Sequence, residues 1–249
     1  VASGDNEMSA ELDRVNREIF EESMEIIKEA WYNERFSFTG KHFVLPPPGI
    51  PDRGSTVQDL TLIPKPIAPI DVWQAVTSPA TLEYAARVGH HAVMPARGIE
   101  KTKTWWDEFG SKANENGWEL GQGDRRCLAL NAHVALTSDK ARNGARNAHD
   151  EWIKFLSPYG RFRSYSMPDG SETPFDHKPS LEDSIDQSVM AIGSVEEVAD
   201  TMGRYRDEVG VEHFVLFFDM PGLTQEAMNE QLELMATEVL PRIGAELNS

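Results

Sequence analysis

The sequence predicts an α/β fold built on a parallel sheet. Apolar runs of strand length alternate along the chain with helices whose apolar residues recur on one face. Strands that are apolar on both faces and alternate with helices are typical of parallel sheets covered by crossover helices. Four such strands are expected, at residues 70–76, 91–95, 127–136 and 213–218. A complete eight-stranded β/α barrel takes about 250 residues, so four strands in 249 residues indicate either long insertions or half of a barrel.

The first part of the chain is expected to hold a helix, a hairpin and a long loop. Residues 11–31 place apolar side chains at helical spacing between acidic ones, which predicts an amphipathic helix. Two short alternating runs meet at Gly40 within residues 36–45, a pattern typical of a β-hairpin. Residues 46–69 contain nine prolines and glycines. The stretch 32–69 is therefore predicted to be a hairpin followed by an irregular excursion.

Helices are predicted after the strands. Ser78 suits a helix N-cap and Pro79 the first helical position, which predicts a helix over residues 78–88. The capping box formed by Ser194 and Glu197 opens another helix. Residues 157–190, which precede that helix, show no periodic pattern, and this stretch is expected to be an irregular, lid-like insertion. The remaining helices are predicted at residues 99–116, 138–156 and 224–243.

The composition argues against several classes of protein. A net charge of −17 would repel nucleic-acid phosphates and anionic membranes, and no apolar run approaches the roughly 20 residues of a membrane span. Cys127 is the only cysteine, which excludes an internal disulfide and a cysteine zinc site. No signal peptide is recognisable at the N-terminus. These features predict a cytoplasmic protein with no metal site and no nucleic-acid or membrane partner.

Six segments, taken in order, resemble the second half of the luciferase-like flavin-dependent monooxygenases. Those segments are FEESMEIIKEAW at 20–31, FSFTGKHF at 36–43, PKP at 64–66, TSPATLEYAARVG at 77–89, IGSVEEVA at 192–199 and EVLPR at 238–242. The resemblance implies a (β/α)8 TIM barrel, here reduced to the C-terminal four strand–helix units in one partial domain over residues 1–249. The absent units would carry much of the flavin ring pocket, often with an active-site histidine.

The resemblance also implies an activity. A protein of this family, or its C-terminal half, would use reduced FMN from a flavin reductase and O2 to oxygenate a small apolar substrate. The cofactor F420, with a reductase activity, is an open alternative. So is a non-catalytic flavin-binding or structural protein, or a truncated product without a function of its own. An open sheet exposes its edge strands, so the chain is expected to form homo-oligomers or to pair with an N-terminal half.

The turn after the first predicted strand is the first candidate site. A parallel strand that leads into a helix presents backbone N–H groups and the positive end of the helix dipole to an anion. The hydroxyls of this turn would add uncharged donors for a flavin phosphate, although Ser78 could equally serve only as an N-cap. The resemblance places phosphate contacts at Ser78 and Thr81. The predicted cofactor-binding residues are Gln74, Thr77, Ser78, Thr81 and Arg97.

Two residues of the third predicted strand are candidates for catalysis. Asn131 and His133 lie on one face of that strand by its period of two. If this face lines the barrel interior, the pair could contact flavin or substrate and His133 could carry protons; a satisfied core histidine is the alternative.

Three further residues belong to the segment 157–190. Arg161, Arg163 and Tyr165 would form a basic, aromatic lid over an anionic cofactor, or part of a disordered loop. At the end of the last predicted strand, Asp219 is expected either to cap the next segment or to face the cofactor ring.

Overall fold

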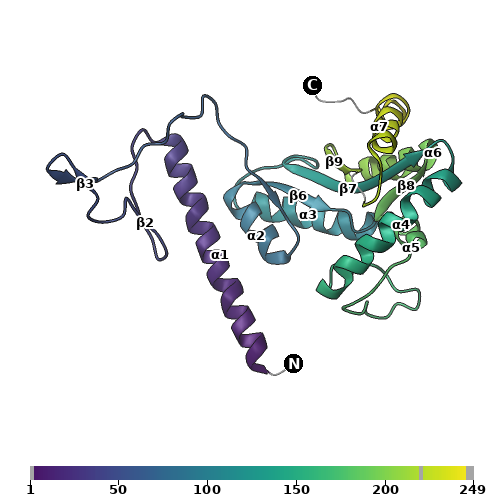
Figure 1. Ribbon diagram of the computed structural model, residues 1–249, viewed down its shortest axis with the longest axis horizontal. Helices are drawn as coiled ribbons and strands as arrows, with labels where there is room; N and C mark the ends of the chain where they lie inside the picture. Colours follow the sequence, from purple (N-terminus) through teal and green to yellow (C-terminus); the bar gives the residue numbers. More distant parts are fainter. Residues whose placement is uncertain (1–2, 219–220, 245–249) are drawn as a thin grey trace. The chain divides into compact units, whose positions relative to one another are not determined.

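A computed structural model describes residues 3–218 and 221–244 of the chain. The chain forms two compact units, Val1–Ile70 and Asp71–Ser249 (Figure 1). Each unit has its own elements and is described separately.

The first unit consists of one long helix, a hairpin and a small second ribbon. Helix α1 spans Ser3–Tyr32, and strands β1 (Phe38–Thr39) and β2 (Val44–Leu45) pair antiparallel. The carboxylate of Glu22 accepts the backbone N–H groups of Lys41, His42 and Phe43 over 2.7, 2.9 and 3.2 Å. The predicted helix and hairpin are therefore confirmed.

The Pro/Gly-rich stretch of the first unit is less irregular than expected. Within it, β3 (Pro51–Asp52) and β4 (Ser55–Thr56) form a two-stranded ribbon, which the sequence pattern did not predict. The turn between them contains Gly54 at φ 93°, a conformation that favours glycine.

The second unit contains a parallel sheet with one strand more than predicted. Its strands are β5 (Trp73–Ala75), β6 (His91–Pro95), β7 (Arg126–Ala135), β8 (Met190–Ser194) and β9 (Phe214–Phe217). All neighbouring strands run parallel. The four predicted strands are present, and β8 is the strand that the sequence analysis missed because its short run of small residues lies at the edge of the stretch taken as irregular.

Strand β7 organises the sheet. It pairs with β6 along Arg126–Ala129 and with β8 along Asn131–Ala135, while β9 pairs with its middle. Figure 1 shows β7 running through the centre of the unit, with α2 and α3 near one end and α4, α5 and α6 near the other. A ten-residue strand can serve three neighbours because each needs only four or five of its residues.

The helices of the second unit begin where the sequence predicted. Helix α2 (Pro79–Val88) has Ser78 as its N-cap, α3 spans Ile99–Glu115 and α4 spans Ser138–Leu156. Helix α6 (Val195–Arg204) opens with the predicted capping box at Ser194. A short helix, α5 (Leu181–Asp186), lies in the stretch taken as irregular. The C-terminal helix starts as α7 (Gln225–Leu234) and continues through the wider turn η3 (Met235–Val239) into α8 (Leu240–Arg242).

The main core lies between the sheet and these helices. Trp106, Phe109, Leu128, Leu130 and Tyr205 are at most 1% exposed within it. Burial of each such side chain contributes about 1.5–3 kcal/mol relative to exposure, so the sheet is a rigid support for the loops at its carboxyl edge. Within the described residues, no helix is both long and apolar enough to cross a membrane.

Candidate functional site

A cavity of about 690 Å³ lies at the carboxyl ends of the strands in the second unit. Thr77 follows β5, Arg97 follows β6, and Asn131 lies in β7. The opposite wall comes from α4 and from residues 160–165, the segment expected to form a lid. The cavity is thus built where open α/β sheets place their ligands, just beyond the carboxyl ends of the strands.

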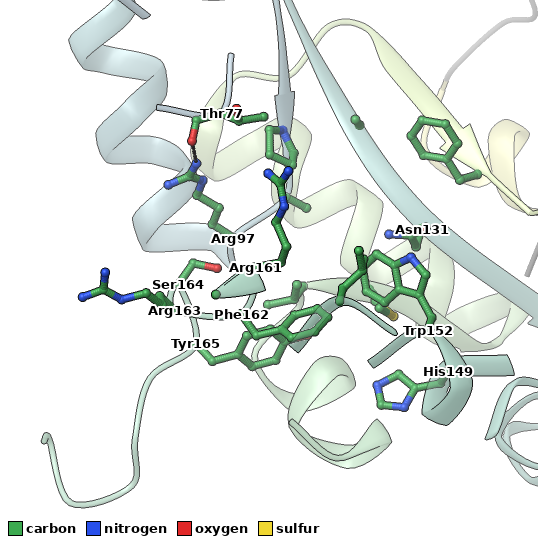
Figure 2. Close-up of a pocket in the computed structure, with 18 of the residues that line it drawn as sticks. Thr77, Arg97, Asn131, His149, Trp152, Arg161, Phe162, Arg163, Ser164 and Tyr165 are labelled. Atoms are coloured by element: carbon green, nitrogen blue, oxygen red, sulfur yellow. Dashed lines mark hydrogen bonds between the residues drawn. The ribbon is translucent and has the colours of Figure 1, made fainter. Parts of the chain in front are cut away.

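Arginine side chains occupy one end of the cavity. The Nη2 group of Arg97 donates to the carbonyl oxygen of Thr77 over 3.0 Å, and its guanidinium lies 3.6 Å from the centre of the Trp105 ring. Arg161 has no hydrogen-bond or ion-pair partner among the residues that the structure describes. Figure 2 shows both side chains extending toward Thr77, whereas Arg163 points away and pairs with Glu172.

This arrangement leaves cationic donors available. Burial lowers the pKa of Arg97, but an arginine stays charged at neutral pH because its ordinary pKa lies above 12. Stacking on Trp105 and the bond to Thr77 fix the plane of the Arg97 guanidinium, and a fixed guanidinium suits the paired oxygens of a phosphate or carboxylate.

Aromatic side chains form the other end of the cavity. The rings of Trp152 and Phe162 meet edge to face with centroids 5.3 Å apart, and those of Phe162 and Tyr165 are 6.1 Å apart. From β9, Phe217 adds a ring that is 44% exposed. A cavity with arginine side chains at one end and aromatic rings at the other has the chemistry to accommodate a ligand that has both a negative charge and a flat ring system.

The turn predicted to cradle a phosphate is a capping box. The Thr81 hydroxyl accepts the backbone N–H groups of Thr77 and Ser78 over 3.2 and 3.0 Å, and donates to the Ser78 carbonyl over 2.9 Å. Its hydrogen-bonding capacity is therefore used. The Ser78 hydroxyl accepts the Thr81 N–H over 3.3 Å and lies 3.1 Å from the Thr81 hydroxyl oxygen, so it is bonded within the same turn. The alternative role of Ser78 as an N-cap is confirmed.

The two candidates for catalysis lie in different surroundings. Asn131 lines the cavity, but His133 does not. The His133 side chain packs against α4, where a Cβ at Gly144 would lie 2.8 Å from its Nε2 atom. It is 5% exposed, its Nδ1 atom has no hydrogen-bond partner in the described part of the chain, and burial lowers its pKa. The structure does not bring these two residues together at the cavity, because α4 covers the strand beyond Asn131.

The remaining predicted residues also divide between cavity and surroundings. Gln74 is not among the lining residues, and its Oε1 atom lies 3.0 Å from Nδ1 of His90. Arg161, Arg163 and Tyr165 all belong to the segment that lines the cavity, but the Arg163 side chain points away from it (Figure 2). Asp219 lies outside the described residues.

The sequence analysis missed a buried polar chain behind the aromatic wall. The Ser184 hydroxyl lies 2.9 Å from Nε2 of His149 and 2.8 Å from the Tyr165 hydroxyl, and none of the three residues is more than 1% exposed. Burial raises the pKa of Tyr165 to about 12. His149 lies on a predicted helix and Ser184 in the stretch predicted to be irregular, and neither carried a signal of contact, since the contact depends on the position of α5.

The fold and cavity define an α/β protein with a half-barrel sheet and a cavity that has arginines at one end and aromatic rings at the other. The family model for luciferase-like monooxygenases matches residues 7–213. The chain therefore belongs to the luciferase-like monooxygenase family, as its sequence segments had indicated. In the described part of the chain, no group of three or more histidine, cysteine or acidic side chains could hold a metal ion.

Individual relatives agree with this family. The chain is 25% identical over 154 residues to 4-hydroxyprotoasukamycin monooxygenase of Streptomyces nodosus subsp. asukaensis, an alignment that covers 62% of this chain and 40% of the relative. The oxygenating constituent of 3,6-diketocamphane monooxygenase of Pseudomonas putida, solved with FMN, superimposes with a TM-score of 0.67 at 19% identity. That match covers 92% of this chain and 64% of the solved one.

A relative with a different cofactor shares the fold. An F420-dependent secondary alcohol dehydrogenase, solved with an F420–acetone adduct, superimposes with a TM-score of 0.52 at 15% identity over 88% of this chain and 59% of that chain. The chain thus spans less than two thirds of the length of each of these proteins, and at these identities the two structures show the fold alone.

Proposed function

We propose that the cavity binds the phosphate-bearing part of a flavin or deazaflavin cofactor, and that the protein acts as a flavin-dependent monooxygenase. One observation carries the proposal: the guanidinium groups of Arg97 and Arg161 share one end of a cavity whose other end is aromatic. In a protein with a net charge of −17, two arginines at one cavity end, neither with an ion-pair partner among the residues that the structure describes, favour an anionic ligand.

The physical chemistry of the two arginines supports a phosphate. Hydrogen bonds from arginine to phosphate are charge-assisted and about twice as strong as neutral ones. Thr77, which lines the cavity beside them, would add a neutral side-chain hydroxyl. In this arrangement Thr81 acts through the turn that it caps, because its hydroxyl is already fully bonded.

When bound, a reduced flavin supplies the electrons for activation of O2. The chain's own residues anchor the phosphate, orient the ring system and keep water from it with the wall formed by Trp152, Phe162 and Tyr165. Asn131 lines the cavity and has an amide that can donate or accept a hydrogen bond. The substrate proposed for this apolar surface is small and largely apolar, and a flavin reductase would supply reduced FMN.

FMN and F420 remain alternatives because both carry a phosphate. FMN is the first candidate, in keeping with a monooxygenase, while F420 would indicate a reductase or dehydrogenase activity. The proposed assembly is a homo-oligomer or a pair with a chain that supplies further strands. The exposed side chain of Trp73 on β5 supports such a contact.

A binding titration tests the proposal. FMN and F420 are each titrated into the wild-type protein and into Arg161→Met, and the dissociation constants are measured by flavin fluorescence. Since Arg161 makes no bond to any residue that the structure describes, its loss should leave the melting temperature unchanged and weaken FMN binding by about tenfold or more. Arg163→Met, on the same segment but turned away from the cavity, is the matched control and should bind as the wild type does.

The outcome separates the candidate functions. No saturable binding of either cofactor, or equal binding by all three proteins, would reject the phosphate site. Cofactor binding with reductase-coupled O2 uptake supports the monooxygenase. Binding without turnover in the assembled protein favours the non-catalytic flavin-binding alternative.

A further inference from the structure

We infer that Gln187, the C-cap residue of α5, is a positioning residue that holds the two arginine-bearing segments of the cavity in register. This inference rests on the proposed phosphate site, because the positioned groups are Arg97 and Arg161. Gln187 does not line the cavity, so it would act only through the two segments that it joins.

The first contact joins Gln187 to the segment that carries Arg161. Its Oε1 atom accepts the backbone N–H of Ser166 over 2.7 Å, and its Nε2 group donates to the carbonyl oxygen of the same residue over 3.1 Å. The side-chain amide thus bonds to both the N–H and the C=O of one residue, as the backbone of a paired antiparallel strand does. Two hydrogen bonds to the backbone of one residue restrain both the position and the orientation of the segment that leads back to Arg161.

The second contact joins the backbone of Gln187 to the loop that carries Arg97. Gly98 has φ 81°, and a Cβ at this position would lie 2.6 Å from the carbonyl oxygen of Gln187. No side chain fits between the two backbones, so the loop and the end of α5 are in direct contact. The same residue therefore touches both segments, one through its side chain and the other through its main chain.

Helix α5 is itself fixed to the body of the unit. Ser184 bonds to His149 of α4 and to the hydroxyl of Tyr165, which belongs to the wall segment. Its backbone and hydroxyl also bond to Ser180 at the start of the helix. Because α5 is anchored at Ser184 and ends at Gln187, it can act as a rigid clamp between the two arginines.

The contacts of Gln187 restrain the distance between the two guanidinium groups. Two guanidinium groups grip one phosphate only if their spacing is held, and a site on loops that is about 1 Å too loose loses much of its affinity. Arg97 follows a strand and is stacked on Trp105, whereas Arg161 belongs to a segment without a strand or a long helix. The segment with the weaker local support is the one that the Gln187 side chain holds.

The variant Gln187→Leu tests the inference, since leucine keeps the approximate size and removes both side-chain bonds. The measured quantity is the ratio of the dissociation constants for riboflavin, which lacks a phosphate, and for FMN. Loss of register should lower this ratio by about tenfold, equivalent to about 1.4 kcal/mol, while riboflavin binding stays nearly constant. Gln225→Leu, which removes an exposed bond to Asn229 on α7, is the matched control and should leave the ratio unchanged.

Hydrogen exchange gives a second readout that does not depend on the ligand. In Gln187→Leu the amides of Ser166 and Arg97 should exchange faster, with little change elsewhere in the sheet. An unchanged affinity ratio, or equal weakening of riboflavin and FMN, overturns the inference even though the wild type binds FMN. A wild-type ratio near one rejects the phosphate site itself. In that case unchanged exchange at Ser166 and Arg97 also overturns the coupling of the two segments.

Discussion

The hydroxyl of Thr81 accepts the backbone N–H of Thr77 over 3.2 Å, across the turn between β5 and α2. This bond occupies a donor that an N-terminal anion site would otherwise offer to its ligand. The turn therefore stabilises the start of α2, and the cationic end of the cavity is left to the arginines.

The substitution Thr81→Val should separate these two roles. Valine keeps the shape of threonine but removes the hydroxyl with which Thr81 completes the capping box, so the free energy of unfolding should fall by about 1 kcal/mol. FMN affinity should change by less than about threefold, because the Thr81 hydroxyl has no capacity left for a ligand. Urea unfolding and a flavin titration measure the two effects. Thr104→Val, a substitution at an exposed helical position, is the control for stability. A tenfold loss of FMN affinity in Thr81→Val would contradict this account and support the phosphate contact at Thr81 that the resemblance implied.

The surroundings of His133 predict that the protein loses stability in acid. Burial lowers the pKa of this imidazole, so the unfolded chain binds a proton at a higher pH than the folded chain does. Stability should be full above the ordinary histidine pKa of about 6.5 and should fall as the pH drops below it. The unfolding free energy of His133→Leu, measured between pH 7 and pH 5, should fall less steeply than that of the wild type. Parallel slopes for the two proteins would contradict this account.

The only cysteine should be inert in the folded protein. Burial raises the pKa of the Cys127 thiol to about 11, so very little thiolate forms at pH 8. A thiol reagent should label the native protein slowly at that pH and label one thiol per chain rapidly in denaturant. Rapid labelling without denaturant would show that β7 opens locally or that the thiol is accessible.

In the first unit, Glu22 should hold the β1–β2 hairpin against α1. Partial desolvation raises the pKa of this carboxyl, but its bonds to the backbone N–H groups of His42, Lys41 and Phe43 outweigh it and lower the pKa overall. The contact should thus be complete above the usual glutamate pKa of about 4.3 and weaken as the pH falls below that value. In Glu22→Gln, which has only one acceptor oxygen, the amides of these three residues should exchange faster at neutral pH.

A neighbouring position provides the control for that measurement. Glu25 lies on the same helix and is exposed, so Glu25→Gln should leave amide exchange in the hairpin as it is in the wild type. Equal exchange in both variants would mean that the hairpin is held by its own strand pairing and not by the helix.

Local patterns in the sequence were sufficient for most elements of the fold. Ser78 with Pro79, and Ser194 with Glu197, mark helix starts through contacts within four residues, and both starts were predicted correctly. Strand β8 was missed because Met190–Ser194 becomes a strand by pairing with β7, a partner far away in the sequence. Helix α5 is only six residues long and has no periodicity to detect.

The candidate site was predicted only in part, for a similar reason. Arg97 and Arg161 could each be placed near the carboxyl edge or in the lid from sequence position alone. Their convergence depends on the fold, and so does the separation of Asn131 from His133, which share a strand face. Contacts such as Gln187 with Ser166 join two loops and carry no sequence pattern at all.

The pairing of β7 with three strands bears on how such a protein can change over evolution. A shift of one residue in this strand would turn every side chain to the opposite face, and it would have to be matched at once by β6, β8 and β9. Insertions are therefore tolerated poorly in the strand and far better in the cavity segments at its end. A lineage built on this sheet can acquire a new ligand by changing residues 157–180 while its framework stays the same.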